Sequence, residues 1–292
     1  VAVPTETVYG LAARADDAAA VARIYRAKGR PDFNPLIVHV SDLAQAQRFA
    51  HVDDRAMALA ERFWPGPLTM VLPLRDDAAL AAMVTAGLPT VALRCPAHPV
   101  MRELLAQTRL PLAAPSANRS GAISPTTAAH VAASLGANVD LIIDGGACAQ
   151  GLESTIVALR NEGSWQLLRP GPIAMAEIAT VLGADLGNAG GAGAGNARAI
   201  EAPGQLASHY APGKPLRLNA VTADADEFHI GFGGVAGTIS LSPSGNLAEA
   251  AARLYACLHA AAAAVQPRIA VAPVPDGGIG AAINDRLSRA AA

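Results

Sequence analysis

Charge is scarce in this 292-residue chain, and neither sign predominates. Charged residues make up 16%, and 22 Lys and Arg stand against 24 Asp and Glu, which leaves a formal net charge of −2. Such a chain has no overall basic field for nucleic acid, so any anion site must be local. The sequence also lacks the run of roughly 20 apolar residues that a membrane-spanning helix needs. Its 52% of hydrophobic residues is ample for a core.

Cysteine is rare as well. Cys95, Cys148 and Cys257 lie far apart, without CxxC spacing or a nearby His, which disfavours a zinc site and a disulfide framework. No GxxxxGK[ST] motif occurs, which excludes a Walker A loop. The chain opens with VAVPTETVYG, without a Met or a signal-peptide pattern and as though already inside a strand. We therefore expect a cytoplasmic protein whose short N-terminal piece is absent.

Short apolar runs alternate with helical patterns as far as about Gly183, which predicts an α/β fold with a mixed sheet. Asp17 is expected to cap a helix of 3.6-residue period that stops at Gly29. Ser41 and Asp53 are expected to open the next two helices. Strands are expected at residues 35–40, 68–74, 90–94, 110–115, 139–144, 154–159 and 165–169.

Composition then changes. Residues 186–204 are rich in Gly and Ala and predict a flexible linker. Beyond it, strands are expected in PLRLNAV, FHIGFG, TISLS and RIAVAPV, with an Ala-rich helix over about 246–265 and a terminal helix over about 281–291. The chain is therefore expected to form a first domain (1–184), a linker (185–213) and a smaller α/β domain (214–292).

Two cations stand at the end of the first predicted helix. Lys28 and Arg30 flank Gly29, and Pro31 turns the backbone away from the helix. The simplest interpretation is compensation of the helix dipole at a solvated end. A Lys point charge beside the planar fork of an Arg is also the pair that a polyphosphate site uses. His39, taken alone, is expected to be a core histidine with satisfied hydrogen bonds.

A polar loop over residues 114–127 follows an apolar strand. Backbone N–H groups at a helix start near Pro125 would suit an anion such as phosphate. In the alternative, it is an ordinary loop in which Ser124 caps the helix and Pro125 takes its first position. Both can hold at once. The loop carries hydroxyl and amide groups on Ser116, Asn118, Ser120, Ser124, Thr126 and Thr127.

Further polar groups stand at expected strand ends, where open α/β sheets bind ligands. Thr90 and Arg94 share one face of a strand, and an Arg there needs a partner such as an anionic ligand. PTETVYG (4–10) can equally be a simple turn, and a lone Arg169 can be a surface charge. Together these groups predict a pocket for a polyphosphate and a carboxylate without naming the reaction. They are Thr5, Glu6, Thr7, Tyr9, Thr90, Arg94, Glu153, Ser154, Thr155 and Arg169.

The order of motifs resembles one family. Over most of residues 3–173 the chain reads PTETVYGL, KGRP…NPLIVH, PGPLT, APSAN.SG..SPTTA.HV, DGG, GLESTIV and LRPG. With PGQLASHYAPGKPLRL, LSPSGNLAEAAARLY and GIGAAINDRLSRAA in the tail, this pattern resembles the threonylcarbamoyl-AMP synthases of the Sua5 type. The resemblance implies a YrdC-like twisted mixed sheet with helices, followed by a smaller Rossmann-like α/β Sua5 domain.

The resemblance also implies an activity. Members condense L-threonine, bicarbonate (or CO2) and ATP to L-threonylcarbamoyladenylate and pyrophosphate, which makes them nucleotidyltransferases. Mg²⁺ is expected to arrive with ATP, without a ligand from a protein side chain. A separate tRNA threonylcarbamoyl transferase complex then modifies adenosine 37 of tRNA. Whether the chain itself binds tRNA stays open.

Site residues follow by motif from the resemblance. Lys28 and Arg30 are expected to be catalytic, and Tyr210 is expected to belong to a lid over the site. L-Threonine contacts are expected from Thr7, His39, Arg94, Ala114 (through its backbone) and Ser154. ATP contacts are expected from Arg30, Asn34, Thr90, Ser116, Asn118, Ser124 and Arg169.

Two alternatives stand beside this interpretation. A YrdC-like domain with a concave basic surface could be a binding module for double-stranded RNA or tRNA, although the net charge of −2 speaks against it. A carbamoyl-transfer enzyme of the hydrogenase-maturation type uses a similar domain, but its acylphosphatase and zinc-finger segments are not visible. The chain also departs from the resembled pattern at PGQLASHYAP, which lacks basic and aromatic residues before its His-Tyr pair, and at Ala12.

Overall fold

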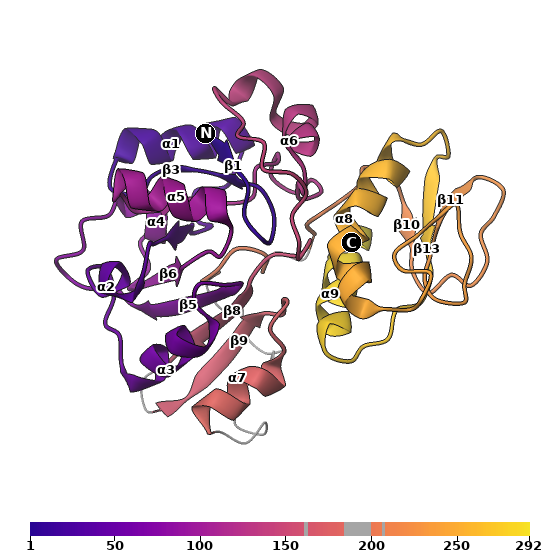
Figure 1. The fold of residues 1–292 in the computed structure, drawn as a ribbon. Coiled ribbons are helices and arrows are strands. Elements are labelled where there is room, and N and C mark those ends of the chain that lie inside the picture. Colours follow the sequence, from indigo (N-terminus) through magenta and orange to yellow (C-terminus); the bar gives the residue numbers. More distant parts are fainter. Residues whose placement is uncertain (161–162, 184–199, 206–207) are drawn as a thin grey trace.

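The computed structural model describes residues 1–160, 163–183, 200–205 and 208–292 (Figure 1). Its described residues form two units with separate main sheets. We call residues 1–183 the large unit and residues 214–292 the small unit. The strands of the large unit are β1 Ala2–Val3, β2 Gly10–Leu11, β3 Ala13–Arg14, β4 Ile37–His39, β5 Leu68–Pro73, β6 Thr90–Arg94, β7 Leu112–Ala113, β8 Thr155–Leu159 and β9 Trp165–Arg169.

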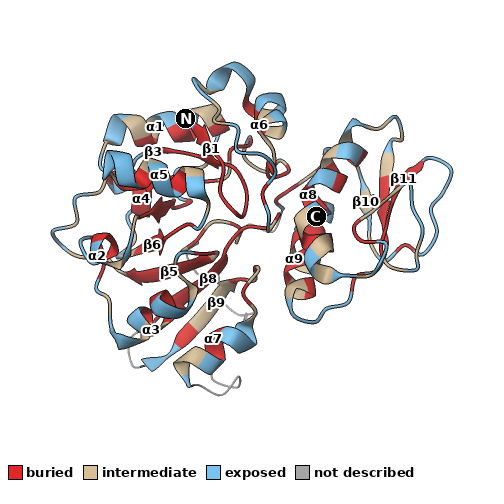
Figure 2. Ribbon diagram, in the orientation of Figure 1, coloured by how far each residue is buried: buried red, intermediate tan, exposed pale blue. Residues whose placement is uncertain are grey.

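The main sheet of the large unit is mixed, as the sequence predicts. Its order is β3-β7-β4-β6-β5-β8-β9; β4 with β6 and β5 with β8 pair in parallel, and the other neighbours pair antiparallel. The central strands are buried, β3 and β9 at the two edges are less so, and the helices around the sheet turn exposed faces outward (Figure 2). These helices are α1 Ala18–Lys28, α2 Leu43–Ala46, α3 Asp54–Phe63, α4 Ala82–Thr85, α5 Pro99–Thr108, α6 Ala128–Leu135 and α7 Met175–Leu182, with the short 3₁₀ turn η1 Gly136–Asn138.

The predicted helix ends agree with the structure where a capping side chain or a glycine next to the helix sets them. Asp17 accepts hydrogen bonds from the first backbone N–H groups of α1, and Gly29 ends that helix with φ of 59°, a left-handed conformation that glycine adopts without strain. Asp53 caps α3 in the same way. At α2 the prediction is wrong by one residue, because Asp42 rather than Ser41 accepts the N–H of Gln45.

The predicted start of α6 is also wrong. Thr127, and not Ser124, accepts the N–H of His130 and caps this helix, which therefore begins at Ala128 rather than near Pro125. Ser124 has another partner, because its buried hydroxyl donates to the Glu153 carboxylate. A side chain already used in a tertiary contact is not available as a cap.

The expected strand over 139–144 does not form as such. The segment makes only an isolated bridge from Ile142 to Ala2 in the two-residue strand β1. Leu141, in the middle of the segment, is 53% exposed, whereas Val139, Ile142 and Ile143 are partly buried against the core. The other strands expected in the large unit are confirmed: β6 and β9 have the expected bounds, and β4, β5, β7 and β8 are shorter.

The small unit is a parallel α/β arrangement, as expected. Its four strands pair in the order β10-β13-β11-β12, all in parallel. Its two helices lie between this sheet and the large unit (Figure 1). Its elements are β10 Leu216–Arg217, β11 Glu227–Gly231, β12 Ile239–Ser240, α8 Leu247–Ala263, β13 Arg268–Val271 and α9 Ile279–Ala291.

The two units share apolar packing. Val8, Ile123 and Leu152 of the large unit belong to the same buried cluster as the core of the small unit, and Tyr210 joins it from the preceding segment. Most of the expected linker lies outside the described residues, so its flexibility and the domain boundaries stay predictions. Within the described ranges, no helix combines the length and the apolarity that crossing a membrane requires.

Candidate active site

A small cavity lies where strand ends of the large unit meet the segment around Tyr210. It encloses about 50 Å³. ATP-sized ligands occupy pockets of roughly 300–1,000 Å³, so this conformation holds at most a small molecule. Many of the predicted site residues line it. The lining is Thr5, Thr7, Val8, Gly10, Arg30, Ile37, His39, Arg94, Ala114, Pro115, Ser116, Glu153, Ser154, Arg169, Pro203, Gly204, His209 and Tyr210.

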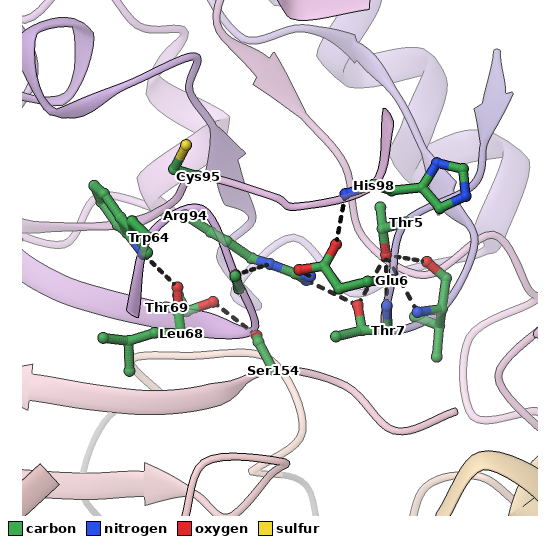
Figure 3. Close-up of polar contacts among 12 residues, drawn as sticks. Thr5, Glu6, Thr7, Trp64, Leu68, Thr69, Arg94, Cys95, His98 and Ser154 are labelled. Carbon is green, nitrogen blue, oxygen red and sulfur yellow. Dashed lines mark hydrogen bonds and ion pairs between the residues drawn. The ribbon is translucent and has the colours of Figure 1, made fainter. Parts of the chain in front are cut away.

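One side of the cavity is built around Arg94, the last residue of β6. Its Nη2 donates to Glu6 Oε1 at 2.6 Å and its Nη1 to Thr7 Oγ1 at 2.9 Å (Figure 3). The Thr5 hydroxyl accepts from the N–H groups of Thr7 and Val8 and so shapes the turn that presents them. Burial alone would raise the pKa of Glu6, but Arg94 outweighs it and holds that pKa below its ordinary value.

His39 lies beside Arg94, because β4 and β6 pair in parallel with these two residues in register. It is 3% exposed, and among the described residues neither of its ring nitrogens has a partner at hydrogen-bond distance and geometry. Burial, followed by the charge of Arg94, lowers its pKa to about 3, so the ring is neutral at pH 7. The expectation of a satisfied core histidine is therefore wrong. An unpaired buried ring costs about 1–3 kcal/mol, which a ligand in the cavity would recover.

Ser154 connects this side to the next. Its Oγ lies 2.7 Å from Thr69 Oγ1 (Figure 3) and accepts from Arg169 Nη2 at 3.0 Å. Arg169 also donates to the Ser154 carbonyl at 3.0 Å and to the Pro203 carbonyl at 3.2 Å. Burial lowers the pKa of Arg169. Its partners are hydroxyl and carbonyl oxygens, so its positive charge is not directly paired with a carboxylate.

Arg30 is a second cation whose hydrogen-bond partners are neutral oxygens rather than a carboxylate. Its guanidinium donates to Asn34 Oδ1 and to the Pro35 carbonyl, both at 2.8 Å. Burial lowers its pKa to about 10, which still leaves it charged at neutral pH. Asn34 itself does not line the cavity. It holds the fork of Arg30, which does.

Lys28 lies behind the cavity wall rather than in it. It is 4% exposed, and its Nζ donates to the Ser116 carbonyl at 2.6 Å and to the Asn118 carbonyl at 2.5 Å. Burial, followed by the charge of Arg30, places its pKa well below the ordinary lysine value. In this conformation Lys28 ties the 116–118 loop to the end of α1. Asn118 Oδ1 is buried without a hydrogen-bond partner.

Two other predicted residues do not join the lining. Thr90 lies at the opposite end of β6 from Arg94 and is half-buried. Ser124 points to Glu153, with its Oγ at 2.5 Å from Oε1.

Sequence reasoning missed the residues that surround Glu153. Tyr255 and Arg286 of the small unit donate to its carboxylate, across 102 and 133 residues of sequence. His209 also lines the cavity and was not assigned. The GLEST motif was the available signal for Glu153, but nothing local in the sequence indicates which distant cation pairs with it.

The carboxylates at the cavity bear on metal binding. Glu6 and Glu153 both line or adjoin it, and each is paired with an arginine. Among the residues that the structure describes, no group of three or more His, Cys, Asp and Glu side chains is arranged to hold a metal ion.

Comparisons with known proteins agree with this architecture. A family model described as "Telomere recombination", that of the Sua5/YciO/YrdC family, matches residues 1–171. A second, described as "Threonylcarbamoyl-AMP synthase, C-terminal domain", matches residues 173–292.

Curated relatives carry the same name. Threonylcarbamoyl-AMP synthases of Bacillus subtilis and Pyrococcus abyssi are 47% and 46% identical over 219 and 213 residues. These matches cover 75% and 73% of this chain and 62% of the length of each relative. The chain thus spans less than two thirds of the length of these curated relatives.

Solved structures extend the likeness to both units. The crystal structure of P. abyssi Sua5 complexed with L-threonine matches 99% of this chain and 89% of that chain, with a TM-score of 0.89 and 36% identity. E. coli YciO matches 58% of this chain and 82% of that chain, with a TM-score of 0.50 and 23% identity, and shows likeness in fold alone. With matched models over both units, the resemblance found in the sequence is confirmed, and the chain belongs to the Sua5/YciO/YrdC family with a Sua5-type C-terminal domain.

Proposed function

We propose that this chain is an L-threonylcarbamoyladenylate synthase, which joins L-threonine, bicarbonate or CO2, and ATP to give threonylcarbamoyl-AMP and pyrophosphate. The observation that carries the proposal is His39, a buried ring with no hydrogen-bond partner, which faces a small cavity between a carboxylate-paired arginine and two arginines without one. The relatives named threonylcarbamoyl-AMP synthase support it.

L-Threonine would occupy the side of the cavity next to Arg94. A carboxylate can accept from Arg94, and the neutral His39 ring offers one donor and one acceptor to the amino acid. Thr7, Ser154 and the Ala114 backbone are the remaining proposed contacts. The small volume suits a small molecule better than a nucleotide, and the structure of P. abyssi Sua5 was solved with L-threonine.

The triphosphate of ATP would lie toward Arg30 and Arg169. These two guanidinium groups line the cavity without a carboxylate partner, so they remain available to phosphate oxygens. Ser116 also lines this wall, whereas Asn34, Asn118, Ser124 and Thr90 would act from behind it or after a rearrangement. Mg²⁺ would enter with ATP, held by phosphate oxygens, and would supply charge neutralisation.

Positioning and charge stabilisation carry the chemistry in this proposal, without a protein nucleophile. The threonine amine adds to the carbon of CO2, or to that of bicarbonate with loss of water, and gives a carbamate. A carbamate oxygen then attacks the α-phosphorus, and the bond to pyrophosphate breaks. Lys28 would support this site by holding the 116–118 loop.

Tyr210 would act as part of a lid. It is 1% exposed and lines the cavity together with His209 and Gly204, so these three residues must move before a nucleotide can enter. A closed site would protect the carbamate, which is short-lived in water. The downstream partner would be a tRNA threonylcarbamoyl transferase complex, and a cytoplasmic location is part of the same proposal.

Pyrophosphate release, with each substrate omitted in turn, tests the proposal. We expect release only when L-threonine, bicarbonate and ATP are all present. Arg30→Ala and Arg169→Ala should each lower the rate by about 10²–10³-fold, since each removes a charge-stabilising donor. Arg75→Ala, which removes an exposed arginine paired with Asp77, is the matched control and should leave the rate unchanged. Equally fast release without an amino acid, or with serine, would refute the assignment.

A further inference from the structure

Glu153 is a negatively charged residue in a cavity that we propose binds a polyanion. It lines the same cavity as Arg30 and Arg169, yet it is itself an anion. Burial would raise the pKa of its carboxyl, but Arg286, followed by Arg169, lowers that pKa to about 2. The carboxylate is therefore charged at neutral pH and would repel a triphosphate unless its charge is compensated.

The compensation comes from the small unit. Arg286 in α9 donates from Nε to Glu153 Oε2 at 2.8 Å, and Tyr255 in α8 donates to the same carboxylate at 2.8 Å. The Ser124 hydroxyl of the large unit donates to the other oxygen of the carboxylate, Oε1. Arg286 and Tyr255 are both 0% exposed, so these contacts are made away from water. Three protein groups, Ser124, Tyr255 and Arg286, thus donate to the two oxygens of this carboxylate.

Arg286 is itself fixed from several sides. It donates to the Pro170 carbonyl at 2.9 Å and to Asp285 at 2.5 Å, and its guanidinium lies 5.4 Å from the centre of the Tyr210 ring. Glu153 directly precedes Ser154, and Pro170 directly follows Arg169. Arg286 therefore contacts the chain next to both of these cavity residues.

We propose that Arg286, assisted by Tyr255, is a positioning residue through which the small unit neutralises Glu153 and holds its carboxylate in place. Arg169 then keeps its oxygen partners Ser154 and Pro203 and remains available to the triphosphate. Arg169 is the other cation whose charge acts on the Glu153 carboxylate, and in the absence of Arg286 a pair between them would remove a phosphate-binding group. This inference rests on the proposed function.

The inference separates the two substrates. The proposed threonine side has its own ion pair, Arg94 with Glu6, and no contact between that pair and the small unit occurs among the described residues. Loss of Arg286 should therefore weaken ATP binding and leave threonine binding nearly unchanged. A unit charge roughly 8 Å from a phosphate, in a partly screened site, changes affinity by about 30-fold.

The test is calorimetric binding of a non-hydrolysable ATP analogue and of L-threonine to the full chain. In Arg286→Met we expect the Kd for the analogue to rise about 30-fold, while the Kd for threonine stays within about twofold, the scatter allowed for a distant change. Adding Glu153→Gln should recover most of the loss, because the uncompensated charge is then gone. Arg268→Met is the matched control, since Arg268 pairs with Asp224 and Asp226 on the surface of the small unit.

The outcomes distinguish a failure of the proposed role of Arg286 from a failure of the proposed function. Equal weakening of both ligands, or no recovery in the double variant, would show that Arg286 merely holds the units together and would overturn the inference. A wild-type chain that binds neither ligand would instead refute the proposed function. If Arg286→Met does not fold, Tyr255→Phe and Tyr255→Phe with Glu153→Gln replace the pair. Because Arg286 still neutralises Glu153 in Tyr255→Phe, we expect a smaller loss of analogue affinity than in Arg286→Met, and Glu153→Gln should again recover it.

Discussion

Lys28→Met is the substitution whose consequences the structure sets out most fully. The buried ammonium donates to the carbonyls of Ser116 and Asn118. Methionine keeps the apolar stem but leaves two buried acceptors without a donor, at about 1–3 kcal/mol each. Relief of the ammonium's own desolvation, which lowers the lysine pKa, offsets part of this. We expect a net loss of about 3 kcal/mol in the free energy of unfolding.

Thermal unfolding and ATP-analogue binding measure the two consequences. A loss of about 3 kcal/mol lowers Tm by roughly 6–12 °C in a protein of this size. The Kd for the analogue should rise as well, because the 116–118 loop forms one cavity wall through Ser116.

The only other lysine of the chain is a matched control. Lys214 also donates to two backbone carbonyls, those of Ala261 and Ala264, but it is half-buried and lies in the small unit. Water can replace its bonds, so Lys214→Met should cost about 1 kcal/mol and leave analogue binding unchanged. An unchanged Tm in Lys28→Met, or equal effects of both substitutions, would refute the role of Lys28 as an internal tie.

Three further substitutions have expected outcomes. His39→Phe should raise the threonine KM about 10-fold or more without loss of Tm, since no protein group pairs with the ring; a lowered Tm with unchanged KM would contradict this. The pKa of Glu153 lies near 2 against an ordinary 4.5, so about 3 kcal/mol of stability is present above pH 4.5 and is lost as pH falls toward 2. Urea unfolding should show a shallower acid slope in Glu153→Gln, and an identical slope would count against the pairing. His130 stacks on His259 between the units, and burial followed by His259 lowers its pKa to about 4 from 6.5. Stability should therefore decline as pH falls from 6.5 to 4, by about 1 kcal/mol after solvent screening, and His130→Gln should remove that decline.

Features set by neighbouring residues could be predicted from the sequence. Asp17 and Gly29 bound α1 because capping and left-handed backbone depend on residues within one turn. The strands at 68–74, 90–94 and 154–159 appear as β5, β6 and β8. A continuous apolar run of this length between turns is typical of a buried strand, whatever its distant partners are.

Features set by distant partners could not be predicted. Ser124 has the composition of a cap but bonds to Glu153, and the cap passes to Thr127. The apolar run 139–144 has the composition of a strand, but only Ile142 finds a bridge partner.

The same division holds in the candidate site. The motifs identified nine of the lining residues, because those residues recur in one order in the resembled family: Thr7, Arg30, His39, Arg94, Ala114, Ser116, Ser154, Arg169 and Tyr210. The motifs did not indicate that Lys28 turns to backbone carbonyls or that Glu153 is paired by Arg286. The first pairing joins residues 88 and 90 positions apart within the large unit, and the second arises from packing between the units; sequence spacing encodes neither.

The most direct test of the central claim, that one cavity brings an amino acid against the phosphates of a nucleotide, is mass spectrometry of the product. The reaction would contain the full chain, L-threonine, ATP and bicarbonate labelled with carbon-13. The account predicts a single adenylate that contains threonine and the labelled carbon, formed together with pyrophosphate. An adenylate without the label, or AMP alone in the presence of all three substrates, would contradict it.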